Sequence, residues 1–174
     1  MKRDVSLWQF AGFALTALGG TLLHFLYEWT GENLAVALVS GVNESTWEHM
    51  KLLYVPLLLF ALIQSRFFRD YKSFWCAKLI GTVAGLLLIP ILFYTYNGAI
   101  GKSPDWLNIT IFFVAAAGTF LLEGHLLRHN YPRCGQPRLA LAILLSIGVL
   151  FAAFTFAPPS LPLFRDPLTG TYGI

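Results

Sequence analysis

Residues 74–96 read F-W-C-A-K-L-I-G-T-V-A-G-L-L-L-I-P-I-L-F-Y-T-Y, and this long apolar run indicates the fold class. Its only charged residue is Lys78, and about 20 predominantly apolar residues are what a helix needs to cross the hydrocarbon core of a bilayer. Four further stretches reach that length, at residues 5–27, 47–64, 104–127 and 137–157. The sequence therefore predicts an all-α integral membrane protein, a single polytopic domain of residues 1–174 with five transmembrane helices.

The charge content excludes a soluble protein. Of the 174 residues, 56% are hydrophobic and only 12% are charged, whereas a soluble domain carries about 25% charged residues. The net charge of +3 does not indicate a nucleic-acid partner, because the basic residues are spread over short segments and no recognition motif accompanies them. We expect membrane lipid, and no nucleic acid, to surround this chain.

The distribution of basic residues predicts the orientation. In a five-span arrangement three basic residues, Lys51, Lys102 and Arg165, share the side of the C-terminus. The other nine share the side of the N-terminus, namely Lys2, Arg3, Arg66, Arg69, Lys72, Lys78, Arg128, Arg133 and Arg138. The positive-inside rule then gives a multi-pass protein of the cell membrane with a cytoplasmic N-terminus and an extracytoplasmic C-terminus. Cys76 and Cys134 fall on the cytoplasmic side, where we expect reduced thiols, and neither is assigned a role.

Two segments outside the spans are also expected to be ordered. Residues 33–42 are too short to cross a membrane and too apolar to lie freely in water, which predicts a re-entrant or interfacial segment at the outer face. Residues 158–174 contain too many prolines and glycines for a helix. They are also too apolar for a disordered tail. We expect a strap that folds over the outer mouth as a lid, or one that only holds helices together.

The densest group of polar residues lies on the outer side. His24 and Glu28 are one helical turn apart, and N-E-S-T-W-E-H-M-K follows at residues 43–51. If the short segment folds the chain back, the two groups converge in an outward-opening pocket. Imidazole and carboxylate groups bind zinc or another divalent metal, or transfer protons as an acid–base pair. The candidate catalytic residues and metal ligands are His24, Glu28, Glu44, Glu48 and His49; the candidate substrate contacts are Asn43, Trp47, Lys51, Tyr94, Asp166 and Tyr172.

Structural interpretations of the same residues remain open. Ser45 and Glu48 have the spacing of a capping box, which would only close the start of the second span. Lys51 either holds an anionic substrate group or neutralises Glu48. A second cluster lies at the end of the fourth span and consists of Glu123, His125, Arg128 and His129. Charged residues are common at membrane boundaries, so we interpret this cluster as a boundary feature rather than a functional site.

The strings N-E-S-T-W-E-H (residues 43–49) and D-P-L-T-G-T-Y-G (residues 166–173) resemble those of a family of small, uncharacterised bacterial multi-pass membrane proteins. The resemblance covers essentially the whole chain, including the H-x-x-x-E of His24 and Glu28. It implies a bacterial cytoplasmic membrane and brings no assigned activity.

The leading functional hypothesis is a membrane-embedded enzyme, metal-dependent or acid–base, that acts on a lipid-like or small amphiphilic substrate. The alternative is a transporter or ion or proton carrier that uses the same residues; Pro56 and Pro90 would break helices in a way that suits transport sites. Many transporters are built from two related halves. Five spans do not divide into equal halves, so a homodimer would supply the missing symmetry. The third hypothesis is a structural accessory subunit.

Overall fold

The computed structural model describes residues 4–101 and 104–174, and the regular elements in these ranges are all helical. A one-turn helix α2 (Leu34–Ala37) and a 3-10 turn η1 (Pro162–Phe164) accompany five long helices, α1 (Val5–Trp29), α3 (Thr46–Ser65), α4 (Phe74–Ile100), α5 (Asp105–Arg128) and α6 (Pro137–Phe156). The five are long and apolar enough to cross a membrane, which confirms the predicted number of such helices.

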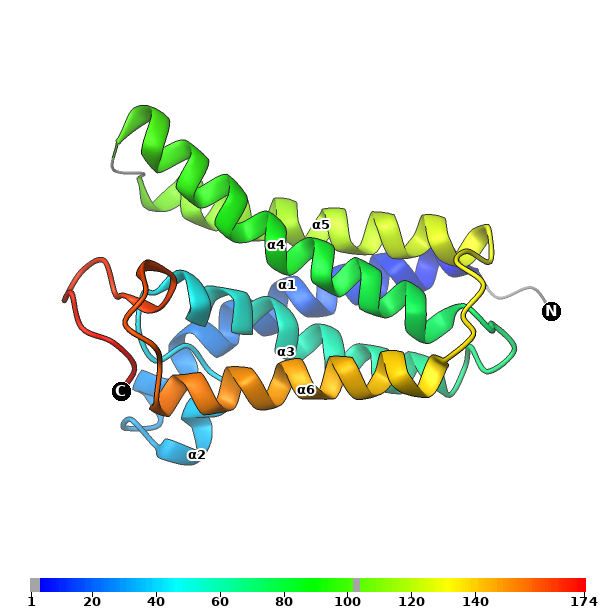
Figure 1. Ribbon diagram of the computed structural model, residues 1–174, viewed down its shortest axis with the longest axis horizontal. Helices are drawn as coiled ribbons and strands as arrows, with labels where there is room; N and C mark the ends of the chain where they lie inside the picture. The colour runs from blue at the N-terminus through cyan, green and yellow to red at the C-terminus, as the bar shows by residue number, and fades with distance from the viewer. Residues whose placement is uncertain (1–3, 102–103) are drawn as a thin grey trace.

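The long helices form one bundle with two distinct ends (Figure 1). The strap end carries α2, η1 and the C-terminal strap of residues 157–174. The basic end carries the connections of residues 66–73 and 129–136, whose basic residues are Arg66, Arg69, Lys72 and Arg133. The start of α1 and the C-terminus lie at opposite ends of the bundle, as an odd number of helices in series requires.

Side-chain caps fix where two of the helices begin. The carboxylate of Asp4 accepts hydrogen bonds from the backbone N–H groups of Ser6 and Leu7 at the start of α1, and the hydroxyl of Ser45 accepts one from the N–H of Glu48 at the start of α3. Such caps satisfy N–H groups that have no partner within the helix. The Ser45 half of the predicted capping box is therefore present.

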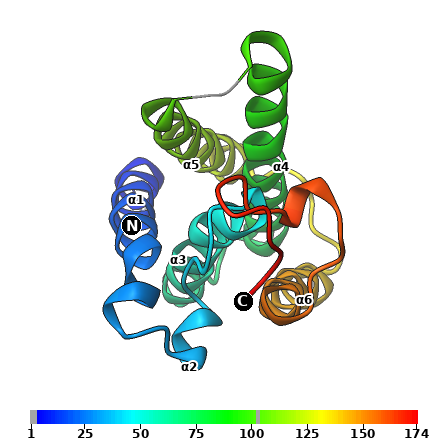
Figure 2. The same cartoon turned by 90° about the vertical axis from the view of Figure 1, so that its left-hand side faces the viewer.

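Helix α3 lies among the other four long helices (Figure 2) and has the most buried membrane-length segment of the five. Close packing depends on glycines of α1, because small residues allow two helix backbones to approach closely. A Cβ atom at Gly20 would lie 2.9 Å from the backbone oxygen of Leu52, and one at Gly19 would lie 3.0 Å from the Cβ of Pro56. Small residues thus allow α1 to approach the backbone of α3.

The second half of α4 and the first half of α5 lean away from the other helices (Figure 1). Pro90 lies within α4 in this region, and a proline in a helix interior removes one backbone hydrogen bond and favours a kink. The divergence leaves room at the strap end between α3, α4 and α5.

Residues 33–42, predicted to be re-entrant or interfacial, form one turn of helix followed by an extended return to α3. The buried hydroxyl of Ser40 donates to the backbone oxygen of Leu23 and accepts from the N–H of Tyr27. The N–H of Gly41 also donates to the oxygen of Leu23. These bonds fold the segment back against the last turns of α1.

The expectation that Cys76 and Cys134 are separate reduced thiols is wrong, because the two sulfur atoms are joined in a disulfide. Cys76 lies in the first turn of α4, and Cys134 lies 58 positions later in the connection from α5 to α6. The pairing could not be predicted from the sequence, because nothing in the spacing shows that this connection returns over the start of α4.

The disulfide predicts a defined labelling pattern. In the purified protein under non-reducing, denaturing conditions, a maleimide-linked polymer should label neither cysteine, and it should label both after reduction, which gel mobility would report. Cys134→Ser should leave Cys76 labelled without reductant. Full labelling of the unreduced wild-type protein would contradict the bond. Because disulfides persist in oxidising compartments, the same assay on intact cells also tests which side of the membrane the basic end faces.

Candidate functional site

Three of the five candidate ligands meet at the strap end. His24 comes from the last turns of α1, Glu44 from the loop before α3, and His49 from the first turn of α3. One potential ligand atom from each lies within 4.8 Å of those of the other two. Their side chains are 30%, 40% and 26% exposed, so the group is partly shielded yet reachable. We call these three residues the His/Glu triad.

The separations in the triad are long for hydrogen bonds and suit a shared metal ion. Nε2 of His24 lies 3.6 Å from one Glu44 carboxylate oxygen, and Nε2 of His49 lies 3.5 Å from the other. A protein N–H···O hydrogen bond is typically about 2.9–3.0 Å long. Two ligands bound to tetrahedral zinc at about 2.0–2.1 Å lie about 3.4 Å apart. Each of the two spacings, measured to a different oxygen of Glu44, is close to one edge of a zinc coordination tetrahedron; with one ligand atom from each residue, the three atoms lie within 4.8 Å of one another.

The backbone fixes which nitrogen His49 presents to the triad. Its Nδ1 lies 2.9 Å from the backbone oxygen of Ser45, and a carbonyl oxygen only accepts, so Nδ1 carries the proton. In the neutral ring, Nε2 then carries a lone pair that is directed at the Glu44 carboxylate. A cation between the two groups would stabilise this arrangement. Metal-binding histidines characteristically donate their other ring N–H to such an acceptor.

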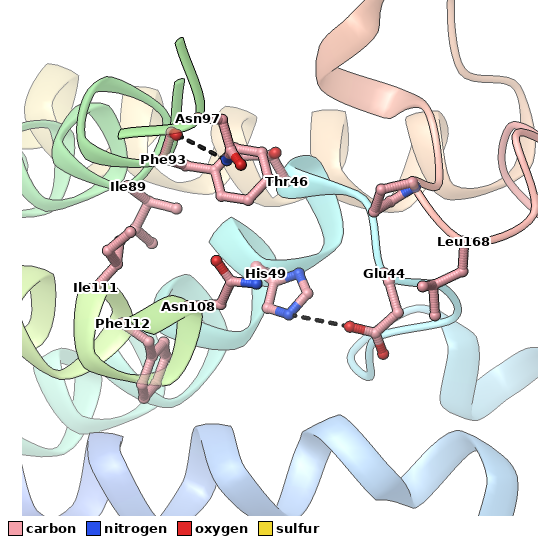
Figure 3. Close-up of a pocket in the computed structure, with 11 residues that line it drawn as sticks. Glu44, Thr46, His49, Ile89, Phe93, Asn97, Asn108, Ile111, Phe112 and Leu168 are labelled. Atoms are coloured by element: carbon pink, nitrogen blue, oxygen red, sulfur yellow. Dashed lines mark hydrogen bonds and ion pairs between the residues drawn. The ribbon is translucent and has the colours of Figure 1, made fainter. Parts of the chain in front are cut away.

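An apolar cavity adjoins the triad. It has a volume of about 150 Å³ and includes Glu44 and His49 in its wall. Figure 3 shows the His49 ring turned toward Glu44, with aliphatic and aromatic side chains of α4 and α5 on the other side of the cavity. The remaining lining residues are Thr46, Ile89, Phe93, Asn97, Asn108, Ile111, Phe112, Pro167 and Leu168. An apolar cavity of about 150 Å³ is large enough for a benzene-sized group.

Glu48, a fourth candidate ligand, does not join the triad. Its carboxylate is 2% exposed and lies 2.5 Å from Nζ of Lys51. It also accepts hydrogen bonds from the N–H of Val42 and the hydroxyl of Thr155 on α6. Nζ of Lys51 donates to the backbone oxygen of Ala37 and to Thr155. Glu48 and Lys51 therefore join α2, α3, α6 and the loop that carries Glu44.

Glu28, the fifth candidate ligand, is exposed one turn beyond His24 on α1 and lies outside the triad. The structure thus separates residues that the sequence grouped together. His24, Glu44 and His49 face one another, while Glu28 faces outward and Glu48 is enclosed.

The six candidate substrate contacts fall into three groups. Asn43 and Trp47 attach the strap: the Asn43 amide donates to the backbone oxygen of Gly173, and the Trp47 ring packs against Phe164 at a centroid distance of 4.7 Å. Lys51 pairs with Glu48 as described above. The other three, Tyr94, Asp166 and Tyr172, line a second cavity of about 380 Å³.

The strap covers the strap end beside both cavities. Pro167 lines both of them, and Leu168 lines the apolar cavity. The Asp166 carboxylate accepts hydrogen bonds from the N–H of Leu168 and the hydroxyl of Thr169, which shapes the turn. Residues 157–174 are thus ordered against the helices, as the composition of the tail predicts.

Two polar residues of the cavity wall are not among the site residues predicted from the sequence. Asn97 and Asn108 are amides near the ends of two apolar helices, and both line the cavity. Polar residues inside apolar helices usually face a partner or a cavity, so this signal was available in the sequence. The apolar lining residues gave no signal, because they resemble lipid-facing residues of the same type.

At the basic end, the sequence predicts that Glu123 belongs to a boundary cluster with His125, Arg128 and His129. In the structure it is fully buried, and its carboxylate lies 2.5 Å from Nζ of Lys78. Lys78, counted among the orientation signals, is fully buried as well. Arg128 instead donates to the hydroxyl of Ser6.

Comparison with known proteins gives a family for the chain. The model of a family of unknown function, DUF6512, matches residues 1–174. The chain belongs to the DUF6512 family. This agrees with the resemblance to an uncharacterised family that the sequence suggested. No curated protein and no solved structure matches the chain. DUF6512 membership therefore brings no activity with it, and the function has to be argued from the site.

Proposed function

We propose that the protein is a membrane-embedded, metal-dependent hydrolase that acts on an amphiphilic substrate. The observation that carries the proposal is the His/Glu triad, with separations of 3.5 and 3.6 Å, two of whose residues, Glu44 and His49, line an apolar cavity. Catalytic zinc sites hold the metal with three protein ligands and keep the fourth position for water or substrate. His24, Glu44 and His49 supply three ligands.

The cavity next to the triad indicates the class of substrate. Most of its wall is apolar, and its polar lining residues are Glu44, Thr46, His49, Asn97 and Asn108. An apolar portion of the substrate would occupy the cavity, while its polar bond would lie at the metal. Metal-bound water has a pKa near 7, so it can attack an ester or amide carbonyl at neutral pH. The two amides are placed to orient the polar group.

The first test is metal binding, with a matched pair of histidine variants. The detergent-purified wild-type protein, loaded with zinc and dialysed, should retain about one zinc per chain. His49→Ala should retain much less, because it removes one of three ligands. His129→Ala, an exposed histidine at the basic end, should bind zinc as the wild type does. Equal zinc content in the two variants, or none in the wild type, would refute the proposed site.

The second test is activity on a defined lipid. Zinc-loaded protein is reconstituted into vesicles of phosphatidylethanolamine and phosphatidylglycerol, and mass spectrometry follows the lipids and their cleavage products. We expect cleavage that depends on zinc and that Glu44→Gln abolishes. Zinc binding without cleavage would count against a hydrolase acting on these lipids.

A metal transporter that uses the same triad is the second candidate. The observation that favours it is a proline inside each of two helices, Pro56 in α3 and Pro90 in α4, because interrupted helices are common at transport sites. The same vesicles distinguish the two functions. Triad-dependent release of zinc into the lumen, with no lipid cleaved, would favour the transporter.

A further inference from the structure

A second set of buried polar side chains lies far from the triad, near the basic end of the bundle. It is formed by four helices and comprises Gln9 of α1, Gln64 of α3, Lys78 and Thr82 of α4, and Glu123 of α5. Gln9 is 6% exposed, and the other four are fully buried. We call these five residues the polar layer.

Contacts between the helices place these residues at one level. A Cβ atom at Gly124 would lie 3.2 Å from Cγ of Gln9, so Gln9 packs against α5 at the residue that follows Glu123. Nζ of Lys78 lies 2.5 Å from the Glu123 carboxylate and 5.6 Å from the centre of the Phe60 ring. Gln64 follows Phe60 by one helical turn. Lys78 is four residues into α4, about 6 Å from the helix end.

Most of the polar atoms in this layer have no partner among the described residues. Both amide atoms of Gln9 and of Gln64, the hydroxyl of Thr82 and one oxygen of Glu123 are buried without a hydrogen bond. A buried polar group left unpaired is costly, and folded proteins rarely leave one so. Several such atoms together are the usual environment of buried water, which makes about three hydrogen bonds per molecule.

The ion pair itself points to a function rather than to stability. Nζ of Lys78 is surrounded by the rings of Phe60, Phe74 and Phe120, at 5.4–5.7 Å from their centres. A buried ion pair seldom stabilises a fold more than apolar residues of the same volume. Ionisable residues within membrane-spanning helices are expensive and mark ion or proton pathways.

We propose that the polar layer binds a cluster of water molecules connected to the aqueous phase at the basic end, and that Glu123 exchanges protons with that phase. A hydronium ion gives its proton to the carboxylate oxygen of Glu123 that Lys78 does not contact. Lys78 remains an ammonium group, so the pair gains one positive charge, and loss of the proton restores it. This inference does not rest on the proposed metal site, which lies at the other end of the bundle.

The other charged side chains that the structure describes at the basic end are exposed; besides those named below, they are Arg69, Asp70, Lys72 and Arg133. Arg128 of α5 donates to Ser6 and lies close to Gly124. Asp4, Arg66 and Arg138 are exposed near the ends of α1, α3 and α6. Helices α1 and α3 contribute only the uncharged amides of Gln9 and Gln64 to the layer. Glu123 is therefore the one carboxylate among the five residues.

The first experiment asks whether the layer holds water, by replacing its glutamines with leucine. In a dry layer, Gln9→Leu and Gln64→Leu would each remove unpaired amide atoms, and the midpoint of thermal unfolding would rise. In a hydrated layer each variant loses hydrogen bonds to water, so we expect the midpoint to stay or fall. Gln136→Leu, at the exposed start of α6, is the control for the substitution itself. A higher midpoint in both layer variants, relative to this control, would overturn the proposal.

The second experiment follows the proton by infrared spectroscopy of the whole protein in lipid. On acidification we expect the C=O band of a protonated carboxyl group, which shifts promptly in D2O because water reaches it. The band should be absent in Lys78→Met/Glu123→Gln, which leaves no buried charge unpaired, and present in Glu32→Gln, which alters an exposed carboxylate. If no band depends on Glu123, or if it fails to exchange in D2O, the proposal is wrong.

Discussion

Replacing Glu48 with alanine is expected to lower the free energy of unfolding by about 3–5 kcal/mol, the cost typical of breaking a buried ion pair. Lys51 is fully buried, and Glu48 is its only ion-pair partner among the described residues. The substitution would leave the ammonium group enclosed without a counter-charge. It would also remove the acceptor for the N–H of Val42 and one for the hydroxyl of Thr155. Denaturant unfolding in detergent, followed by tryptophan fluorescence, measures the loss.

A double replacement separates the charge from the packing. Glu48→Leu/Lys51→Met removes both charges and keeps similar volumes, so it should recover most of the stability that Glu48→Ala loses. Lys51→Met alone should be strongly destabilising, because Glu48 then lies buried without its partner. If Glu48→Ala costs less than about 1 kcal/mol, as exposed pairs do, the pair is not enclosed as described.

The same variants test whether Glu48 positions the triad. Its hydrogen bond to Val42 holds the loop that carries Glu44. We therefore expect the double variant to regain stability but to bind zinc about 10–100-fold more weakly than the wild type, the usual effect of removing a residue that orients a ligand. Wild-type zinc affinity in the stable double variant would show that the loop holds its position without Glu48.

The second large effect concerns the metal itself. Glu44→Ala should weaken zinc binding by more than about 100-fold, because losing a ligand costs more than losing a residue that orients one. Competition with a chelating dye on the purified protein measures the affinity. Stability should change little, since the Glu44 side chain is 40% exposed.

Glu28→Ala is the matched control for Glu44→Ala. Both residues are exposed or partly exposed glutamates at the strap end, and the sequence offered both as ligands. Only Glu44 lies with His24 and His49. We expect Glu28→Ala to bind zinc within a few-fold of the wild type. Equal losses in the two variants would mean that general negative charge, and not a coordinated carboxylate, attracts the metal.

The helices could be predicted because their signal is local. Each of the five long helices overlaps a stretch that was apolar over about 20 residues. The boundaries were less accurate: α4 continues to Ile100, four residues beyond the predicted end at residue 96. The start of α3 could be predicted closely, because Ser45 caps it through bonds to nearby residues. Caps and spans depend on neighbours in sequence, so the sequence contains them.

The candidate site could be predicted only as a region. The sequence pointed to the end of α1 and the start of α3, where His24, Glu44 and His49 do lie together. It did not separate them from Glu48, which is enclosed through its contacts with Lys51 and with Thr155, a residue 107 positions away. It likewise gave no means of pairing Cys76 with Cys134 or Lys78 with Glu123.

Composition and proline content act over short stretches, so five apolar helices and an ordered C-terminal strap could be predicted from the amino-acid sequence. Which ionisable side chains face a cavity, which neutralise one another and which share the polar layer became clear only from the packing of the helices. Those outcomes depend on the rotation of each helix about its axis and on distances between residues remote in sequence. In an apolar bundle, small residues such as Gly20 and buried hydrogen bonds determine both the rotation of the helices and these distances.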